Sequence, residues 1–102
     1  MVTIRLFCAA GMSTSIVVNK MKEAAKEKNI EVDIEAFPQG QMDKYLDNVD
    51  VALLGPQVAY TLSKSEKICV SRGIPIDVIP MVDYGMMNGE KILDFALKLA
   101  KQ

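Results

Sequence analysis

The stretch Val2-Thr3-Ile4-Arg5-Leu6-Phe7-Cys8-Ala9-Ala10-Gly11-Met12-Ser13-Thr14-Ser15 decides how the rest of the chain is arranged. Its first part, residues 2–7, is rich in β-branched and bulky apolar side chains and predicts a strand. The residues from about Ile16 onward predict a helix. A cysteine, Cys8, is therefore expected at the end of a strand, in a loop of small residues, at the entrance of a helix.

Such a loop can bind an anion. The first N–H groups of a helix have no partner within it, and the helix dipole favours negative charge there. The small residues Ala9, Ala10 and Gly11 allow close approach of the backbone, and the hydroxyls of residues 13–15 can cap the helix or bind an oxyanion. The same position can lower the pKa of a thiol from about 8.5 toward ~3.5–7.5. The alternative is a buried, inert cysteine before an ordinary helix cap.

The amino-acid composition argues for a soluble globular protein and against several other classes of protein. The chain has 102 residues, half of them apolar and a quarter charged, which predicts one soluble globular domain over residues 1–102. A formal net charge of −1 gives no electrostatic reason to expect nucleic-acid or anionic membrane partners. No apolar run approaches the ~20 residues that span a bilayer, and no signal-like segment is evident. The two cysteines, Cys8 and Cys69, favour a cytoplasmic protein with free thiols.

The chain contains no histidine. This excludes Cys-His and Ser-His-Asp catalysis, histidine phosphocarriers and histidine-ligated metal sites. Two thiols without a CxxC spacing also argue against structural zinc. We therefore expect neither a metal nor a cofactor, and any nucleophilic chemistry must depend mainly on Cys8.

Strand and helix patterns alternate along the chain. Strands are predicted over residues 2–7, 30–36, 49–54 and 74–79, and helices over 14–28, 42–48, 58–69 and 89–101, with a loop over 80–88. This order predicts an α/β fold with three layers, a parallel sheet between helices on both faces. Ligands of such sheets bind beyond the carboxyl ends of the strands, where the loops over 8–15, 55–58 and 80–88 should meet.

Two chemistries suit a cysteine in this setting. Low-molecular-weight tyrosine phosphatases have a similar strand, cysteine loop and helix, with an arginine six residues after the cysteine, where this chain has Thr14. A loop of amides and hydroxyls without a guanidinium can hold a phosphocysteine without hastening its hydrolysis, as a phosphoryl carrier requires. A binding domain without catalytic activity is a third reading.

The segments LFCAAGMSTS, IEAFPQG, VALLGPQVAY and VDYGMMNG make the chain resemble the IIB component of the bacterial phosphoenolpyruvate:sugar phosphotransferase system, lactose/cellobiose (N,N'-diacetylchitobiose) class. The resemblance covers nearly the whole chain. It implies a four-stranded parallel sheet in the order 2-1-3-4. It also implies that Cys8 accepts a phosphoryl group from a phosphohistidine of a IIA partner. Cys8 would then pass the group to a cellobiose-, chitobiose- or lactose-type sugar imported through a membrane IIC partner.

The remaining site residues follow from these readings. The phosphoryl group is expected to bind to Ala9, Ala10, Gly11, Met12, Ser13, Thr14 and Ser15. Pro56, Gln57 and Tyr84 are possible contacts from the second and third loops, although a turn at 55–57 and core packing of Tyr84 explain these residues as well. Met81 is expected in the core.

Overall fold

The computed structural model describes residues 1–9 and 11–101, and the side chains of residues 11–13 are outside that description. The strands are β1 (Val2–Cys8), β2 (Val32–Pro38), β3 (Val51–Leu54) and β4 (Ile76–Val78). The α-helices are α1 (Gly11–Glu27), α2 (Leu62–Ser71), α3 (Met81–Gly85) and α4 (Gly89–Ala100). Two 3₁₀ segments, η1 (Gln39–Tyr45) and η2 (Pro56–Thr61), follow β2 and β3. None of the helices in the described residues has the length and apolarity needed to cross a membrane.

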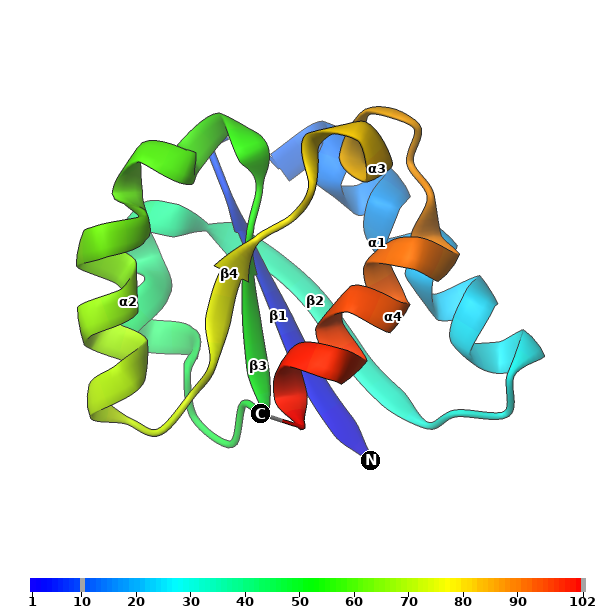
Figure 1. The fold of residues 1–102 in the computed structure, drawn as a ribbon, viewed down its shortest axis with the longest axis horizontal. Helices are drawn as coiled ribbons and strands as arrows, with labels where there is room; N and C mark the ends of the chain where they lie inside the picture. Colours follow the sequence, from blue (N-terminus) through cyan, green and yellow to red (C-terminus); the bar gives the residue numbers. More distant parts are fainter. Residues whose placement is uncertain (10, 102) are drawn as a thin grey trace.

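The four strands form one parallel sheet in the order β2-β1-β3-β4 (Figure 1). This confirms the predicted order, with the charged strand β2 at an edge. Pro75 precedes the other edge strand, and its carbonyl accepts a hydrogen bond from Ala52 N–H at 3.0 Å. Proline suits this position because it has no N–H to donate to the sheet.

Side chains of β3 show how the sheet divides the core. All four residues of this strand are buried. Val51 and Leu53 belong to a cluster with α1 and α4, whereas Ala52 and Leu54 belong to a second cluster with η1 and α2. The alternation follows from the two-residue period of a strand, and burial on both faces explains why β3 is uniformly apolar.

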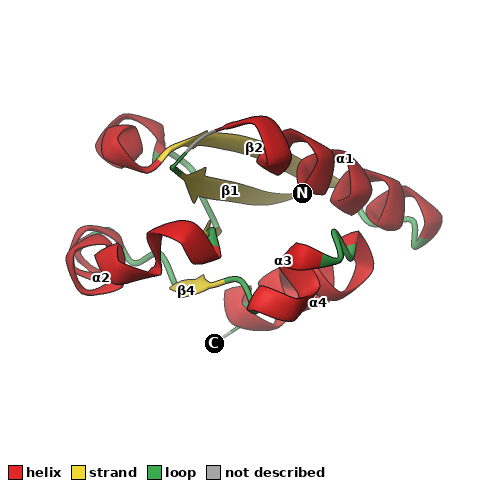
Figure 2. Cartoon of the chain, turned by 90° about the horizontal axis from the view of Figure 1, so that it is seen from above, coloured by secondary structure: helices red, strands yellow, loops and turns green. Residues whose placement is uncertain are grey.

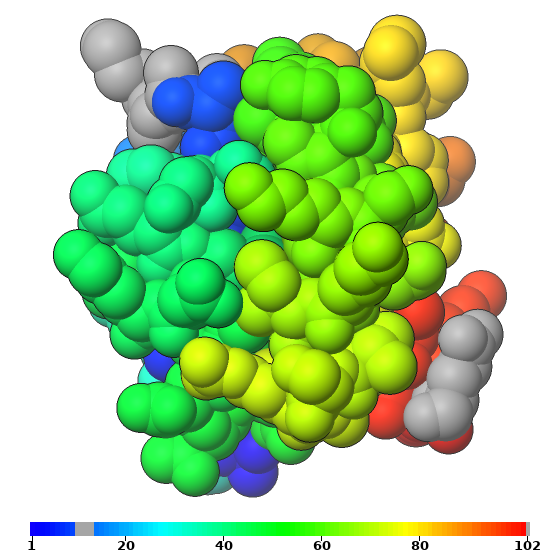
Figure 3. All heavy atoms as spheres, turned by 90° about the vertical axis from the view of Figure 1, so that its left-hand side faces the viewer, coloured from blue at the N-terminus to red at the C-terminus, as the bar shows by residue number. Residues whose placement is uncertain are grey.

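Helices cover both faces of the sheet, as predicted. Figure 2 shows α1, α3 and α4 on one side of the strands, and α2 on the other. In Figure 3, η1 (teal) and α2 (yellow-green) lie side by side over that second face. Their contact includes Cys69 Sγ and Met42 Sδ, 3.9 Å apart, and Gln39 Nε2 donating to Ser65 Oγ at 3.2 Å.

Several predicted boundaries differ from the structure. The loop expected over 80–88 contains the one-turn helix α3, which is too short to show periodicity in the sequence. The helix expected over 58–69 starts instead within the 3₁₀ segment η2, in which Val58 (φ −115°, ψ 22°) leaves helical geometry, and α2 begins only at Leu62. The helix expected over 42–48 is a 3₁₀ segment over Gln39–Tyr45. The fourth strand is only Ile76–Val78.

Helix α1 begins close to Cys8 and ends at the opposite edge of the sheet, where β2 starts. The helix begins at Gly11, three positions after Cys8 and earlier than predicted. It ends at Glu27, one residue before the predicted end at residue 28, and Asn29 adopts a left-handed conformation (φ 55°). Ile30 N–H then returns to the carbonyl of Ala25 at 2.9 Å and directs the chain into β2.

Candidate functional site

Cys8 is the last residue of β1, at the carboxyl edge of the sheet. Gly55 follows β3 there, and its N–H donates to the carbonyl of Phe7 at 2.9 Å. The chain after β4 is tied to the same edge, because Ile79 N–H donates to the carbonyl of Leu54 at 2.9 Å. Parallel pairing therefore delivers the ends of three strands to one place.

The sulfur of Cys8 packs against Gly55. Cys8 is only 3% exposed, and a Cβ atom placed on Gly55 would lie 2.8 Å from Cys8 Sγ. The same point lies 3.0 Å from Gln57 Oε1, so the predicted second-loop residue Gln57 turns its amide toward the cysteine. Gly55 has φ −64° and ψ 149°, a conformation open to any residue. The glycine is thus required for space, not for backbone freedom.

Thr14 and Tyr84 form a buried pair of hydroxyls beside the cysteine. Thr14 is fully buried, Tyr84 is 8% exposed, and Thr14 Oγ1 lies 3.1 Å from the Tyr84 hydroxyl. Thr14 comes from the second turn of α1 and Tyr84 from α3. Both side chains also hydrogen-bond to Cys8. Tyr84 therefore contacts the site through its hydroxyl while its ring joins the core.

Burial raises the pKa of the Cys8 thiol above its ordinary value. Hydrogen bonds from Thr14, Tyr84 and the backbone of Gly55 lower the pKa, but they do not offset the loss of solvation. The prediction that the helix entrance lowers this pKa is therefore wrong. The physical reason is that the sulfur lies inside the fold, where the charged form is poorly solvated.

A depression of about 320 Å³ lies on one side of the hydroxyl pair. It is lined by Pro56, Gln57, Met81, Tyr84 and Gly85. Met81 is 74% exposed, so its prediction as a core residue is wrong. The reason is that Met81 opens the short helix α3, and the one buried side chain of that helix is Tyr84.

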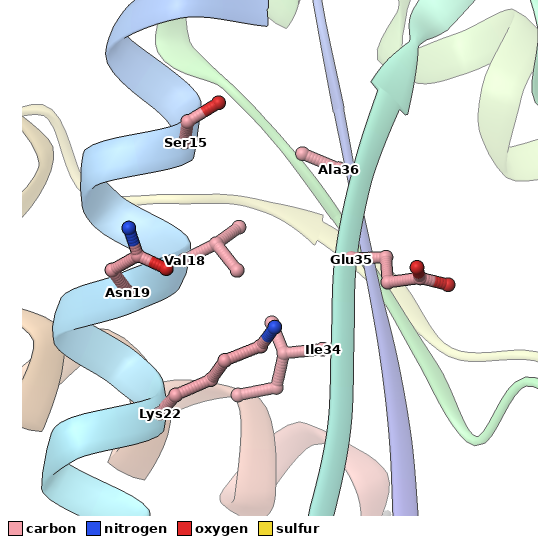
Figure 4. A pocket seen from close by; sticks show the side chains of 7 residues that line it. All are labelled: Ser15, Val18, Asn19, Lys22, Ile34, Glu35 and Ala36. Atoms are coloured by element: carbon pink, nitrogen blue, oxygen red, sulfur yellow. The ribbon is translucent and has the colours of Figure 1, made fainter.

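The other predicted loop residues are placed differently. Ala9 is exposed, and Ser15 is exposed on α1, where it lines a groove against β2 (Figure 4). Ala10 lies outside the described residues. The backbone of Gly11, Met12 and Ser13 forms the first turn of α1, and their side chains lie outside the description.

Both arginines are engaged elsewhere. Arg5 donates to the Asp33 carboxylate at 3.2 Å and to the Asp33 carbonyl at 3.0 Å, on the side of β2. Arg72 caps the C-terminus of α2, with its guanidinium 3.9 Å from Asp47. Neither guanidinium is near Cys8, and Thr14 occupies the position at which the phosphatases have their arginine.

The sequence predicts the loop over 55–58 beside the cysteine loop, but it assigns no role in the site to Gly55 itself. The signal for it was a Gly-Pro pair directly after the buried strand β3, next to the strand that ends in the cysteine. A glycine in a conformation that needs no glycine indicates a close neighbour, but that conformation is visible only in the structure.

Residues 3–95 match the family model of the PTS system, Lactose/Cellobiose specific IIB subunit. The chain is 46% identical to the PTS system galactose-specific EIIB component of Lactococcus lactis subsp. cremoris, with 94% of each chain covered. It is 45% identical, at the same coverage, to the cellobiose-specific EIIB component of Lactococcus lactis subsp. lactis. The oligo-beta-mannoside-specific EIIB component of Bacillus subtilis is 38% identical, with 94% of this chain and 93% of the relative covered.

Solved structures show the same fold. The solution structure of the cellobiose-specific IIB component from Borrelia burgdorferi has a TM-score of 0.81 at 42% identity, with 98% of this chain and 92% of that chain covered. The lactose-specific IIB domain from Streptococcus pneumoniae has a TM-score of 0.86 at 20% identity, with 96% of each chain covered, a likeness of fold alone.

Proposed function

Because the chain belongs to the lactose/cellobiose-specific IIB family of the PTS system, we propose that it carries a phosphoryl group on Cys8. The donor is a phosphohistidine of a IIA partner, and the acceptor is a sugar of the cellobiose, chitobiose or lactose type imported through a membrane IIC partner. The protein works in the cytoplasm as a single domain over residues 1–102. It needs no cofactor or metal, and nucleic acid is not among its partners.

One observation carries this proposal: of the two thiols in the described part of the chain, Cys8 is the one at the carboxyl edge of the sheet, held between Gly55 and two hydroxyls. The backbone N–H groups at the start of α1 can donate hydrogen bonds to the oxygens of a phosphoryl group. In the proposed assignment Ala9, Ala10, Gly11, Met12, Ser13, Thr14 and Ser15 hold that group. Pro56, Gln57 and Tyr84 contribute contacts from the other two loops.

Phosphoryl transfer to Cys8 is balanced without an added base. The S–P bond forms as the P–N bond of the donor breaks, and the thiol proton ends on the departing imidazole nitrogen. In the second step the sugar oxygen attacks phosphorus, the S–P bond breaks with its electron pair going to sulfur, and the sugar hydroxyl proton replaces the phosphoryl group on sulfur. The raised thiol pKa means that the sulfur carries its proton at the start and at the end of this cycle.

The placement of both arginines favours a carrier over a phosphatase. A phosphatase needs a group that stabilises the charge of the transferring phosphoryl when water attacks, and a guanidinium commonly provides it. Arg5 is paired with Asp33 and Glu35, and Arg72 lies at the far end of α2. A phosphocysteine in this setting is expected to persist until an acceptor arrives.

The test is the intact mass of the protein after mixing with a phosphohistidine-bearing IIA protein, followed by mapping of the adduct. We expect one phosphoryl group on Cys8. Cys8→Ser should abolish it, and Cys69→Ala should retain it because Cys69 lies in the opposite core cluster. Hydrolysis of an aryl phosphate without a stable adduct would favour the phosphatase. A binding domain would be favoured if the wild-type protein gained no phosphoryl group and bound an anion as tightly as the Cys8→Ser variant does.

A further inference from the structure

The hydroxyl of Tyr84 reaches the site from a part of the chain remote from the cysteine loop. Its partner, Thr14, is 70 positions away in sequence, and the two oxygens are 3.1 Å apart. Both residues are buried, so water does not compete freely for this contact. A hydrogen bond in such surroundings restricts both side chains more than one on the surface would.

The ring of Tyr84 has a separate role from its hydroxyl. The ring joins the core cluster formed by α1, α4 and the sheet. Packing alone would be served equally well by phenylalanine, which lacks the oxygen. A buried tyrosine hydroxyl needs a polar partner, and here the partners include Thr14 and Cys8. The oxygen therefore takes part in the site, whereas the ring takes part in the core.

We propose that Tyr84 is a positioning residue for phosphoryl transfer, whose hydroxyl orients Thr14 Oγ1 and the Cys8 sulfur against Gly55. This inference rests on the proposed carrier function and assigns to Tyr84 a role at the sulfur itself. Gly55 limits the sulfur on one side, since a Cβ there would approach it to 2.8 Å. On the other side, hydrogen bonds from the hydroxyls of Thr14 and Tyr84 restrict the position of the sulfur.

The protons on the Cys8 thiol and on the two hydroxyls explain how the hydroxyls of Thr14 and Tyr84 assist both transfer steps. In the resting thiol, Cys8, Thr14 and Tyr84 carry one proton each, so each of the three groups can donate one hydrogen bond. When sulfur bears negative charge, as the S–P bond forms or breaks, it only accepts, and both hydroxyl protons can turn toward it. Hydrogen bonds to a charged group are stronger than those between neutral groups. The pair therefore stabilises sulfur most when it carries charge.

The pKa of Cys8 supports this arrangement. Hydrogen bonds from Thr14 and Tyr84 lower the pKa and so oppose the effect of burial. Removal of the Tyr84 hydroxyl should raise the pKa further, because one of the groups that favours the thiolate is lost.

The experiment compares Tyr84→Phe with Tyr45→Phe. Tyr45 is the matched control, because its ring is likewise packed against a core cluster, but the other one, where it stacks on Phe37 at a centroid distance of 3.8 Å. The pH dependence of iodoacetamide alkylation is followed by peptide mapping at Cys8. We expect the midpoint to rise by about one pH unit in Tyr84→Phe, the worth of one hydrogen bond to a charged group, and to stay at the wild-type value in Tyr45→Phe.

Transfer from the phosphorylated donor gives the second readout. We expect the rate constant at saturating donor to fall about tenfold in Tyr84→Phe, with the donor concentration for half saturation unchanged. A purely structural role would leave the alkylation midpoint where it is, and an unshifted midpoint in folded Tyr84→Phe overturns the proposal.

Thr14→Val keeps the inference testable if Tyr84→Phe does not fold. Valine preserves the shape of threonine and removes the other hydroxyl, so the midpoint should rise there too, and no rise overturns the proposal. With both variants folded, the double variant should shift less than the sum of the two, because the hydroxyls act as a pair. The proposed function is judged separately: if wild-type protein accepts no phosphoryl group, the carrier assignment fails, while the alkylation midpoint still tests Tyr84.

Discussion

Gly55 and the sulfur of Cys8 are so close that position 55 has no room for a side chain. A Cβ atom at this position would lie 2.8 Å from Cys8 Sγ, although the backbone of Gly55 suits any residue. The end of β3 therefore forms a wall for the nucleophile at the end of β1. The two strands are neighbours in the sheet, with Phe7 paired to Leu54, which fixes the distance between wall and sulfur.

Gly55→Ala should fold and lose activity. The added methyl must displace the Cys8 side chain, and a misplacement of about 1 Å can lower a transfer rate about 100-fold. The free energy of unfolding should change little by comparison, because the atom in the way is the free end of a side chain. Phosphoryl transfer and urea unfolding measure the two effects. Gly40→Ala is the control, since a Cβ at Gly40 meets nothing within 4 Å. Equal transfer rates in both variants would contradict the prediction.

Cys8 should react slowly with alkylating reagents at neutral pH. Its raised pKa means that the thiol, and not the thiolate, dominates there, and only the thiolate is nucleophilic. The alkylation rate at Cys8 should keep rising at pH values where a cysteine in an unfolded peptide has already reached its plateau, above its pKa of about 8.5. Peptide mapping after timed alkylation measures this directly. A plateau below neutral pH would show that the helix entrance outweighs burial.

Cys69 should make the fold sensitive to alkali. Burial raises the pKa of this thiol to about 11; the Arg72 charge lowers the pKa and the Asp43 charge raises it, both by less than burial does. In the unfolded chain the thiol ionises near pH 8.5, so the contribution to stability is complete below that value and is lost as pH rises toward 11. The expected loss is about 3 kcal/mol in the free energy of unfolding.

Urea unfolding of the wild type and Cys69→Ala at neutral and alkaline pH tests this. The variant lacks the titrating group, so its free energy of unfolding should fall less between the two conditions. The cost of the cavity appears at both pH values and cancels from the comparison. Parallel decreases in the two proteins would exclude Cys69 as the cause.

Gly89→Ala should destabilise the packing of α4 on α1. A Cβ at Gly89 would overlap the backbone carbonyl of Lys20, which cannot move aside as the end of a side chain can. Overpacking of this kind costs roughly 1–3 kcal/mol. Chemical denaturation should show a lower midpoint than for Gly40→Ala, where the space is open. An unchanged free energy of unfolding would contradict the prediction, because it would mean that α1 and α4 can move apart at no cost in stability.

The sequence alone predicts much of the fold because its signals are local. The alternation of apolar and charged residues in β2 indicates a strand with one exposed face, and the uniformly apolar sequence of β3 indicates a strand buried on both faces. The helix stop at Asn29 depends on a conformation that asparagine tolerates. The one-turn helix α3 and the break at Val58 escaped prediction, because neither extends over enough residues to produce a period.

The prominence of Cys8 at a helix entrance and the lack of any histidine were decided by the sequence itself, since they depend only on residue order and composition. Tertiary structure decided the state of the thiol. Burial of the sulfur, the wall formed by Gly55 and the hydroxyl of Tyr84 all come from residues far from position 8 in the chain. Solvation and hydrogen bonding act through space, so the pKa of Cys8 could be reasoned correctly only after the strands and α3 were placed around it.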